Sequence, residues 1–171
     1  YQNPAATAEA LKDGWLYTGD IGRVDAEGYL KITDRKKDII VTAGGKNVAP
    51  QNIENDLKTD PFVSQVVVHG DKRRFLSALV TVNEENARKW AAENKVALGP
   101  KLHEDPVVRD RIQKAIDAVN AKNASYSTIK RFAILERDFT QEGGELTPTL
   151  KVKRKVVSER YKALLDSFYA E

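Results

Sequence analysis

The sequence predicts an α+β fold: β-hairpins and a short, mainly antiparallel sheet flanked by helices. Residues 17–34 alternate apolar and polar side chains around a glycine-containing turn, which is typical of a hairpin. Two β-branched runs, 62–70 and 75–82, are separated by a short charged turn and should pair antiparallel. Residues 106–123 space their apolar side chains for one face of an amphipathic helix.

Capping and turn residues predict the other elements of the first half. Asn3, followed by a proline at the first helical position, predicts a helix over residues 3–12. Residues 38–49 surround a Gly-Gly turn and predict a second, tighter hairpin. Pro50 then opens a helix that runs to about Lys58.

In the second half, Asn83 should cap a helix of about ten residues. A loop over 95–105, a strand over 132–135 and a polar loop over 139–145 precede a terminal helix over 156–169. His69 is interpreted as a strand-end residue rather than a catalyst. The side chains expected in the core include four aromatic residues: Trp15, Trp90, Phe132 and Phe168.

Composition limits the class of protein. The chain has 171 residues, 41% hydrophobic and 31% charged, enough for one globular domain of roughly 100–150 residues with an appendage. It contains no Cys, which excludes disulfides and Cys-ligated zinc and fits a reducing, cytoplasmic location. Its two His residues are isolated, so we expect no metal site built by this chain. No apolar run approaches the ~18 residues of a transmembrane segment.

Charge and chain ends add two expectations. A net charge of +3 and a pI near 9.0 fit anionic ligands such as nucleotides, CoA or a phospholipid surface, so peripheral membrane contact stays open. The chain does not begin with Met and contains none, and its first residues resemble the middle of a longer sequence. We therefore expect a fragment of a larger protein.

Residues 14–50 hold the most informative polar side chains. Asp20 ends a Tyr-Thr-Gly-Asp element, and a carboxylate can accept hydrogen bonds from both hydroxyls of a diol. Arg35 lies in the charged run Asp-Arg-Lys-Lys-Asp, and its planar fork suits a phosphate or ribose. A turn aspartate and a solvated charge run are the structural alternatives.

These elements, together with Thr-Ala-Gly-Gly-Lys-Asn at 42–47 and Leu-Thr-Pro-Thr-Leu-Lys-Val-Lys-Arg at 146–154, resemble the carboxyl-terminal part of the acyl-adenylate-forming (AMP-binding) enzymes. The form of the second cluster is similar to that of long-chain fatty acyl-CoA synthetases. Most adenylating enzymes have Gly before the catalytic Lys, whereas this chain has Leu150. The resemblance covers essentially the whole chain.

The resemblance implies a role for each matching position. Residues 1–36 would end the large amino-terminal domain, and residues 37–171 would form the small mobile lid. Glycine is suited to a loop whose backbone lies against a narrow ligand. The implied site residues are the nucleotide-binding Tyr17, Thr18, Asp20 and Arg35, the hinge Lys37, the CoA-tunnel residues Gly44, Gly45 and Lys46, and the catalytic Lys151.

The resemblance also implies a two-step reaction. A fatty acid and ATP, with Mg²⁺, first give acyl-AMP and pyrophosphate, and CoA as co-substrate then displaces AMP. The lid would present Lys151 for the first step and rotate about Lys37 to present the Gly44 loop for the second. Because the phosphate loop, adenine pocket and acyl tunnel of such enzymes lie in the large domain, the chain alone is expected to be inactive.

Two other interpretations remain open at this stage. The basic run at 153–155, with the Arg73-Arg74 turn, could form a patch for nucleic acid or anionic lipid. Lys153, Arg154 and Lys155 could also be confused with Lys151, and all four could form a solvated face. The Arg73-Arg74 turn could meet a CoA phosphate or be solvated. No nucleic-acid motif is present and no aromatic residues interleave with these cations, so no nucleic-acid partner is expected. Carrier-protein ligases and the adenylation domains of peptide synthetases share the Tyr-Thr-Gly-Asp and hinge elements, so an adenylating ligase with another acceptor is the second alternative. We expect the helix-face residues Asn52 and Glu54 to do no chemistry.

Overall fold

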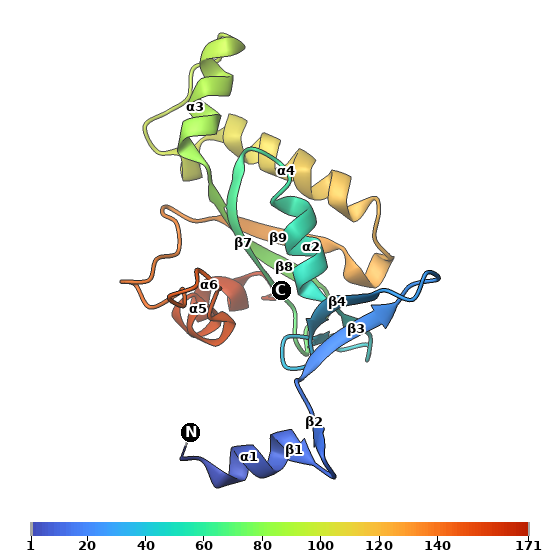
Figure 1. The fold of residues 1–171 in the computed structure, drawn as a ribbon. Coiled ribbons are helices and arrows are strands. Elements are labelled where there is room, and N and C mark those ends of the chain that lie inside the picture. The colour runs from blue at the N-terminus through green and yellow to red at the C-terminus, as the bar shows by residue number, and fades with distance from the viewer. Residues whose placement is uncertain (1, 171) are drawn as a thin grey trace.

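The computed structural model describes residues 2–170, which form an α+β body with an extended amino-terminal arm (Figure 1). The body is built on a sheet of β7 (Val63–His69), β8 (Leu76–Val82) and β9 (Ile129–Ile134), in the order β7-β8-β9. β7 and β8 pair antiparallel, as predicted, whereas β9 runs parallel to β8. A parallel strand needs a long crossover, and α3 (Glu84–Glu93) and α4 (Pro106–Asn120) provide it.

Apolar side chains fill both sides of this sheet, because neighbouring residues of a strand point to opposite faces. Val66 of β7 packs into a cluster with α4 and α2 (Pro50–Leu57). Val67, the next residue, packs into a second cluster with α5 (Arg154–Arg160) and α6 (Lys162–Ser167). Helices therefore cover both faces of the sheet, with α2 and α4 opposite α5 and α6 (Figure 1).

Two hairpins precede α2, and both are confirmed. β3 (Asp20–Val24) pairs with β4 (Leu30–Arg35), and the turn between them contains Gly28 at φ +90°. This left-handed conformation is one that glycine adopts without a steric penalty. β5 (Ile40–Val41) pairs with β6 (Asn47–Val48), and α2 follows directly.

The amino-terminal arm projects away from the body (Figure 1). It comprises α1 (Pro4–Ala10), capped by the Asn3 side chain, and the short ribbon of β1 (Leu11–Lys12) and β2 (Trp15–Leu16). Trp15 is 74% exposed, so its placement in the core is wrong. The two strands of the ribbon pair with each other, and the indole stays uncovered.

The other predicted core aromatics lie in or beside the two clusters. Phe132 is buried, and Trp90 and Phe168 are half-buried at the cluster edges. Trp90 meets Phe62 edge to face with ring centroids 5.3 Å apart. His69 is the last residue of β7, as predicted. None of the helices within residues 2–170 combines the length and the apolar character needed to cross a membrane.

The structure corrects several predicted boundaries. The terminal helix is two helices, α5 and α6, which break at Tyr161 (φ −99°, ψ 20°) and so bring Val157 and Leu165 into the same cluster. β9 begins at Ile129, three residues before the predicted strand. Short 3₁₀ turns not foreseen from the sequence lie at Leu102–Glu104 and Ser125–Ser127.

The segment 139–145 is not simply a polar loop, because both of its end residues are buried. Glu145 is fully buried and receives hydrogen bonds from Arg137 (2.8 and 3.0 Å), the Thr140 N–H (3.1 Å) and Arg160 (2.6 Å). Burial works to raise the pKa of Glu145, but these donors together lower it to about 2.

We predict that Glu145 makes folding stability depend on pH. Its folded pKa lies below the unfolded value, so its contribution is complete above about pH 5 and is lost as the pH falls toward 2. A shift of this size corresponds to up to about 3 kcal/mol. Urea unfolding should show Glu145→Gln less stable than the wild type at pH 7, with the difference shrinking by pH 3. A difference that does not change with pH would contradict the role of the carboxylate.

Candidate functional site

Asp20 and Arg35 face each other at the open end of the β3–β4 hairpin. They are register partners, and Arg35 Nε lies 3.1 Å from Asp20 Oδ1. Both side chains remain partly exposed, with 59% of Arg35 and 26% of Asp20 accessible. Thr18 Oγ1 accepts the Asp20 N–H at 3.1 Å, and Tyr17 lies exposed beside it with Lys12 Nζ 5.9 Å from its ring centroid. The hairpin therefore offers a carboxylate and a guanidinium side by side.

Lys151 lies on a tight loop that its own backbone closes. An antiparallel bridge between Leu146 and Val152 forms the base of the loop. Thr147 donates its N–H to the Lys151 carbonyl at 2.8 Å, and its hydroxyl accepts the Lys151 N–H at 3.0 Å. Leu150 adopts φ +59° immediately before Lys151. A left-handed residue other than glycine is thus built into the position directly before Lys151.

One hollow of about 450 Å³ brings the hairpin and this loop together. Asp20 and Arg35 line it from β3 and β4, and Lys151 and Leu150 line it from the loop. Lys58 contributes from the residue after α2. The predicted nucleotide-binding carboxylate and guanidinium and the predicted catalytic lysine therefore share one concave surface, although the lysine lies more than 100 residues from the other two in the sequence.

A buried ion pair holds the Lys151 loop in place. Arg154 contacts both carboxylate oxygens of Glu54 on α2, at 2.7 Å for Nη1 to Oε1, and Val68 donates its N–H to Oε1 at 2.7 Å. Glu54 is 6% exposed, and burial raises its pKa while Arg154 partly offsets that rise. The alternative of a solvated basic face therefore does not hold for Arg154, because this side chain turns inward. Lys153 and Lys155 do remain exposed.

Lys37 lies exposed in the turn between the hairpin and the body. The Asp38 N–H donates to the Arg35 carbonyl at 2.9 Å and closes this turn, with Lys37 as its third residue. Arg154 Nε lies 4.0 Å from Asp38 Oδ1. The turn thus joins the two segments that line the hollow.

The Gly44 loop lies on a different surface. Gly45 has φ +71° and donates its N–H to the Thr42 carbonyl at 2.8 Å, whereas Gly44 has no positive φ. Lys46 Nζ lies 5.8 Å from the Tyr126 ring centroid. The residues that line the Lys151 hollow include none of Gly44, Gly45 or Lys46. The structure therefore separates the two predicted sites.

The Arg73-Arg74 turn supports the Gly44 loop through its backbone. The Ala43 N–H donates to the Arg73 carbonyl at 2.9 Å. The Arg73 side chain pairs with Asp166 and lies 4.8 Å over the Tyr169 ring. This arginine is thus held by the carboxyl-terminal helix rather than free in solvent.

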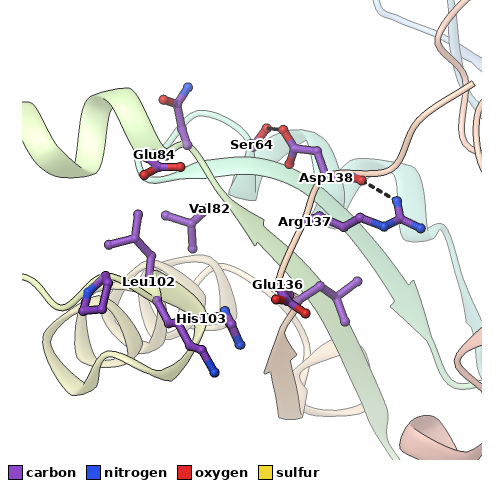
Figure 2. A pocket seen from close by; sticks show the side chains of 12 residues that line it. Ser64, Val82, Glu84, Leu102, His103, Glu136, Arg137 and Asp138 are labelled. Atoms are coloured by element: carbon purple, nitrogen blue, oxygen red, sulfur yellow. Dashed lines mark hydrogen bonds between the residues drawn. The ribbon is translucent and has the colours of Figure 1, made fainter. Parts of the chain in front are cut away.

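A second hollow, of about 490 Å³, lies at the far end of the sheet (Figure 2). Its polar groups bond to one another: Asp138 accepts hydrogen bonds from Ser64 (2.9 Å) and Thr81, and Arg137 donates to the Asp138 carbonyl at 2.8 Å. It contains none of the predicted site residues. Within residues 2–170, His, Asp and Glu side chains form no group of three or more that could hold a metal ion.

The structure is a small α+β domain with a hairpin joined to it by a short turn. The loop of the domain presents the Lys151 side chain to a hollow that Asp20 of the hairpin also lines. A family model described as the AMP-binding enzyme C-terminal domain matches residues 37–171. The chain belongs to this family, and the sequence-based recognition and fold class are confirmed.

Its curated relatives are long-chain fatty acid ligases by name. It is 45% identical over 172 residues to the long-chain-fatty-acid–CoA ligase FadD15 of Mycobacterium tuberculosis, covering 99% of this chain and 29% of that protein. It is 42% identical over 186 residues to ACSBG1, the long-chain-fatty-acid–CoA ligase of Rattus norvegicus, covering 96% of this chain and 26% of that protein. The chain therefore spans less than a third of the length of these relatives.

Solved structures show the same fold. The adenylation domain of a carboxylate reductase from Mycobacterium chelonae matches with a TM-score of 0.81 at 27% identity, over 100% of this chain and 26% of that one. A Mycobacterium tuberculosis fatty acyl CoA synthetase matches with a TM-score of 0.53 at 32% identity, over 94% of this chain and 27% of that one.

We predict that Leu150→Gly stabilises the fold. Leu150 is 68% exposed, so its side chain loses little burial, while its left-handed backbone costs about 1–2 kcal/mol. After the added flexibility of glycine is subtracted, a gain of about 0.5–1 kcal/mol should remain. The gain in the free energy of unfolding is measured by thermal unfolding, with Thr149→Gly as the control variant. Because Thr149 has no positive φ, Thr149→Gly should be less stable than the wild type. Equal losses in both variants would contradict the strain.

Proposed function

We propose that this chain is the hinge and carboxyl-terminal lid of a long-chain fatty acid–CoA ligase. Residues 1–36 would end the large domain and residues 37–171 would form the lid. The single observation that carries the proposal is the hollow in which Lys151 faces Asp20 and Arg35. Identity of 41–45% to several long-chain-fatty-acid–CoA ligases supports the choice of substrate class.

In the first step, a carboxylate oxygen of the fatty acid would attack the α-phosphorus of ATP, and the bond to pyrophosphate would break. Negative charge would accumulate between the two reactants, and the Lys151 ammonium would balance it. Asp20 would accept hydrogen bonds from the ribose hydroxyls, with Arg35 beside it as a cation for ribose or phosphate. Tyr17 and Thr18 would complete the nucleotide end, because they lead directly into Asp20.

In the second step, the CoA thiol sulfur would attack the acyl carbon, and AMP would leave. The Gly44 loop would line the path of CoA, since its backbone is exposed and carries no bulky side chain at Gly44 and Gly45. Lys46 would flank that path. The separation of this loop from the Lys151 hollow supports two arrangements of the lid, one for each step, related by rotation at Lys37.

A carrier protein is the second candidate acceptor. The carboxylic acid reductase of Segniliparus rugosus, solved as a didomain with AMP, matches with a TM-score of 0.76 at 29% identity. The names of the curated relatives reported above, which are CoA ligases, favour CoA. We propose that Mg²⁺ arrives with ATP and is held outside this chain, because the described residues provide no cluster for it. Cytoplasmic location and peripheral membrane contact stay predictions.

In the full-length ligase, Lys151→Ala should reduce acyl-adenylate formation by roughly 10²–10³-fold, the effect of removing one preorganised charge. Thioester formation from supplied acyl-AMP should persist, because Lys151 faces the hollow only in the first arrangement. Pyrophosphate release and acyl-CoA formation measure the two steps separately. Lys153→Ala is the matched control, since Lys153 is exposed on the same segment. Equal loss in both steps, or a larger effect of Lys153→Ala, would reject Lys151 as the catalytic lysine.

Lys37→Pro should hold the lid in one arrangement. Proline at the third position of the 35–38 turn fixes its own φ and forces Lys36 out of the helical region. The backbone can then no longer rotate between the two arrangements of the lid. One half-reaction should continue while the other slows on the order of tenfold or more. Lys36→Ala, which leaves the backbone free, is the control. A uniform slowing of both steps by Lys37→Pro would show that Lys37 is an ordinary surface residue.

A further inference from the structure

Asp34 is a buried carboxylate at the end of the hairpin, one residue before Arg35. It is only 1% exposed. A carboxylate removed from water needs hydrogen-bond donors or a nearby cation to offset the loss of hydration. On its own side of the turn, Asp34 Oδ1 accepts only the Arg35 N–H, at 2.6 Å. Its other partners come from the body.

The first of these partners is the beginning of α2. Gln51 donates its N–H to Asp34 Oδ2 at 3.4 Å. The N-cap residue of α2, Ala49, makes no side-chain capping bond, and Pro50 has no N–H. Gln51 therefore carries the first free N–H of the helix, and Asp34 supplies the cap that the local sequence lacks.

The second partner is a charge. The guanidinium of Arg154 lies near enough to Asp34 for the two charges to interact, while its hydrogen bonds hold Glu54. Arg154 follows the Lys151 loop, so the same side chain anchors that loop and lines the hollow together with Asp34. Both body-side partners of Asp34 therefore belong to elements that position the hollow.

We propose that Asp34 is a positioning residue that latches the hairpin onto the body and favours the arrangement in which Lys151 faces Asp20. The proposal rests on the hinge of the proposed function. Asp34 and Gln51 lie on opposite sides of Lys37, so rotation at Lys37 separates them. The carboxylate must then be hydrated and α2 loses its cap, which disfavours the rotated arrangement until other contacts replace the latch.

The first test uses the chain itself. Because the chain has no Cys, Glu27→Cys on the hairpin and Glu85→Cys on α3 accept two spin labels at exposed sites. Asp34→Ala should raise the population outside the wild-type distance peak by on the order of fivefold, the effect of one lost cap. Asp34→Asn keeps a hydrogen-bond acceptor, so its population outside this peak should lie between those of the wild type and Asp34→Ala. Asp56→Ala removes an exposed charge from α2 and should leave the wild-type distribution.

The second test uses the two half-reactions of the full-length ligase. Asp34→Ala should lower acyl-adenylate formation about fivefold and leave thioester formation from acyl-AMP unchanged or faster. A purely structural role would lower both. Distances identical in wild type and Asp34→Ala, or equal loss in both half-reactions, would overturn the latch. A wild-type protein that makes no acyl-adenylate would instead overturn the proposed function, and the distance measurement would still decide the latch.

Discussion

The buried pair of Glu54 and Arg154 is the interaction on which the rest of the site depends. It joins α2, the Val68 N–H of β7 and the beginning of α5 at one point. Removing one partner of such a pair leaves a buried charge without compensation, which costs about 3–5 kcal/mol. Because Arg154 directly follows the Lys151 loop, the lysine is placed by the same contact that holds the helix to the sheet.

Glu145 plays the corresponding role at the other end of that loop. It accepts hydrogen bonds from Arg137 and Arg160, while its carbonyl accepts the Lys153 N–H at 2.8 Å. The loop that carries the exposed Lys151 is thus held at both ends, by Glu145 before it and by Arg154 after it. A reactive cation on a short loop gains precision from such anchors, since the side chain itself stays flexible.

The amino-terminal arm differs from the Lys151 loop because, among the described residues, no buried ion pair holds it against the body. Most of the exposed large apolar side chains of residues 2–170 lie before residue 33, on the arm and the β3–β4 hairpin. Only the end of the hairpin meets the body, where Asp34 is buried beside α2. This contrast makes the hairpin end the natural place for a movable connection, because the polar contacts of Asp34 with Gln51 and Arg154 hold it there.

The sequence by itself determined the hairpins, the β7–β8 pair and the capped helices, because each depends on local periodicity, turn glycines or capping residues. The residues of the candidate site were predicted from short motifs and a family resemblance, and their roles stay predictions. Only the tertiary structure decided which charges are buried. Arg154 lies in a basic run that suggests solvent, Asp34 begins a charged run that suggests the same, Glu54 has no distinctive neighbours in the sequence, and Glu145 follows two glycines. Their roles come from partners distant in the sequence, 100 residues away for Glu54 and Arg154, and no local pattern encodes a contact that exists only after the chain has folded.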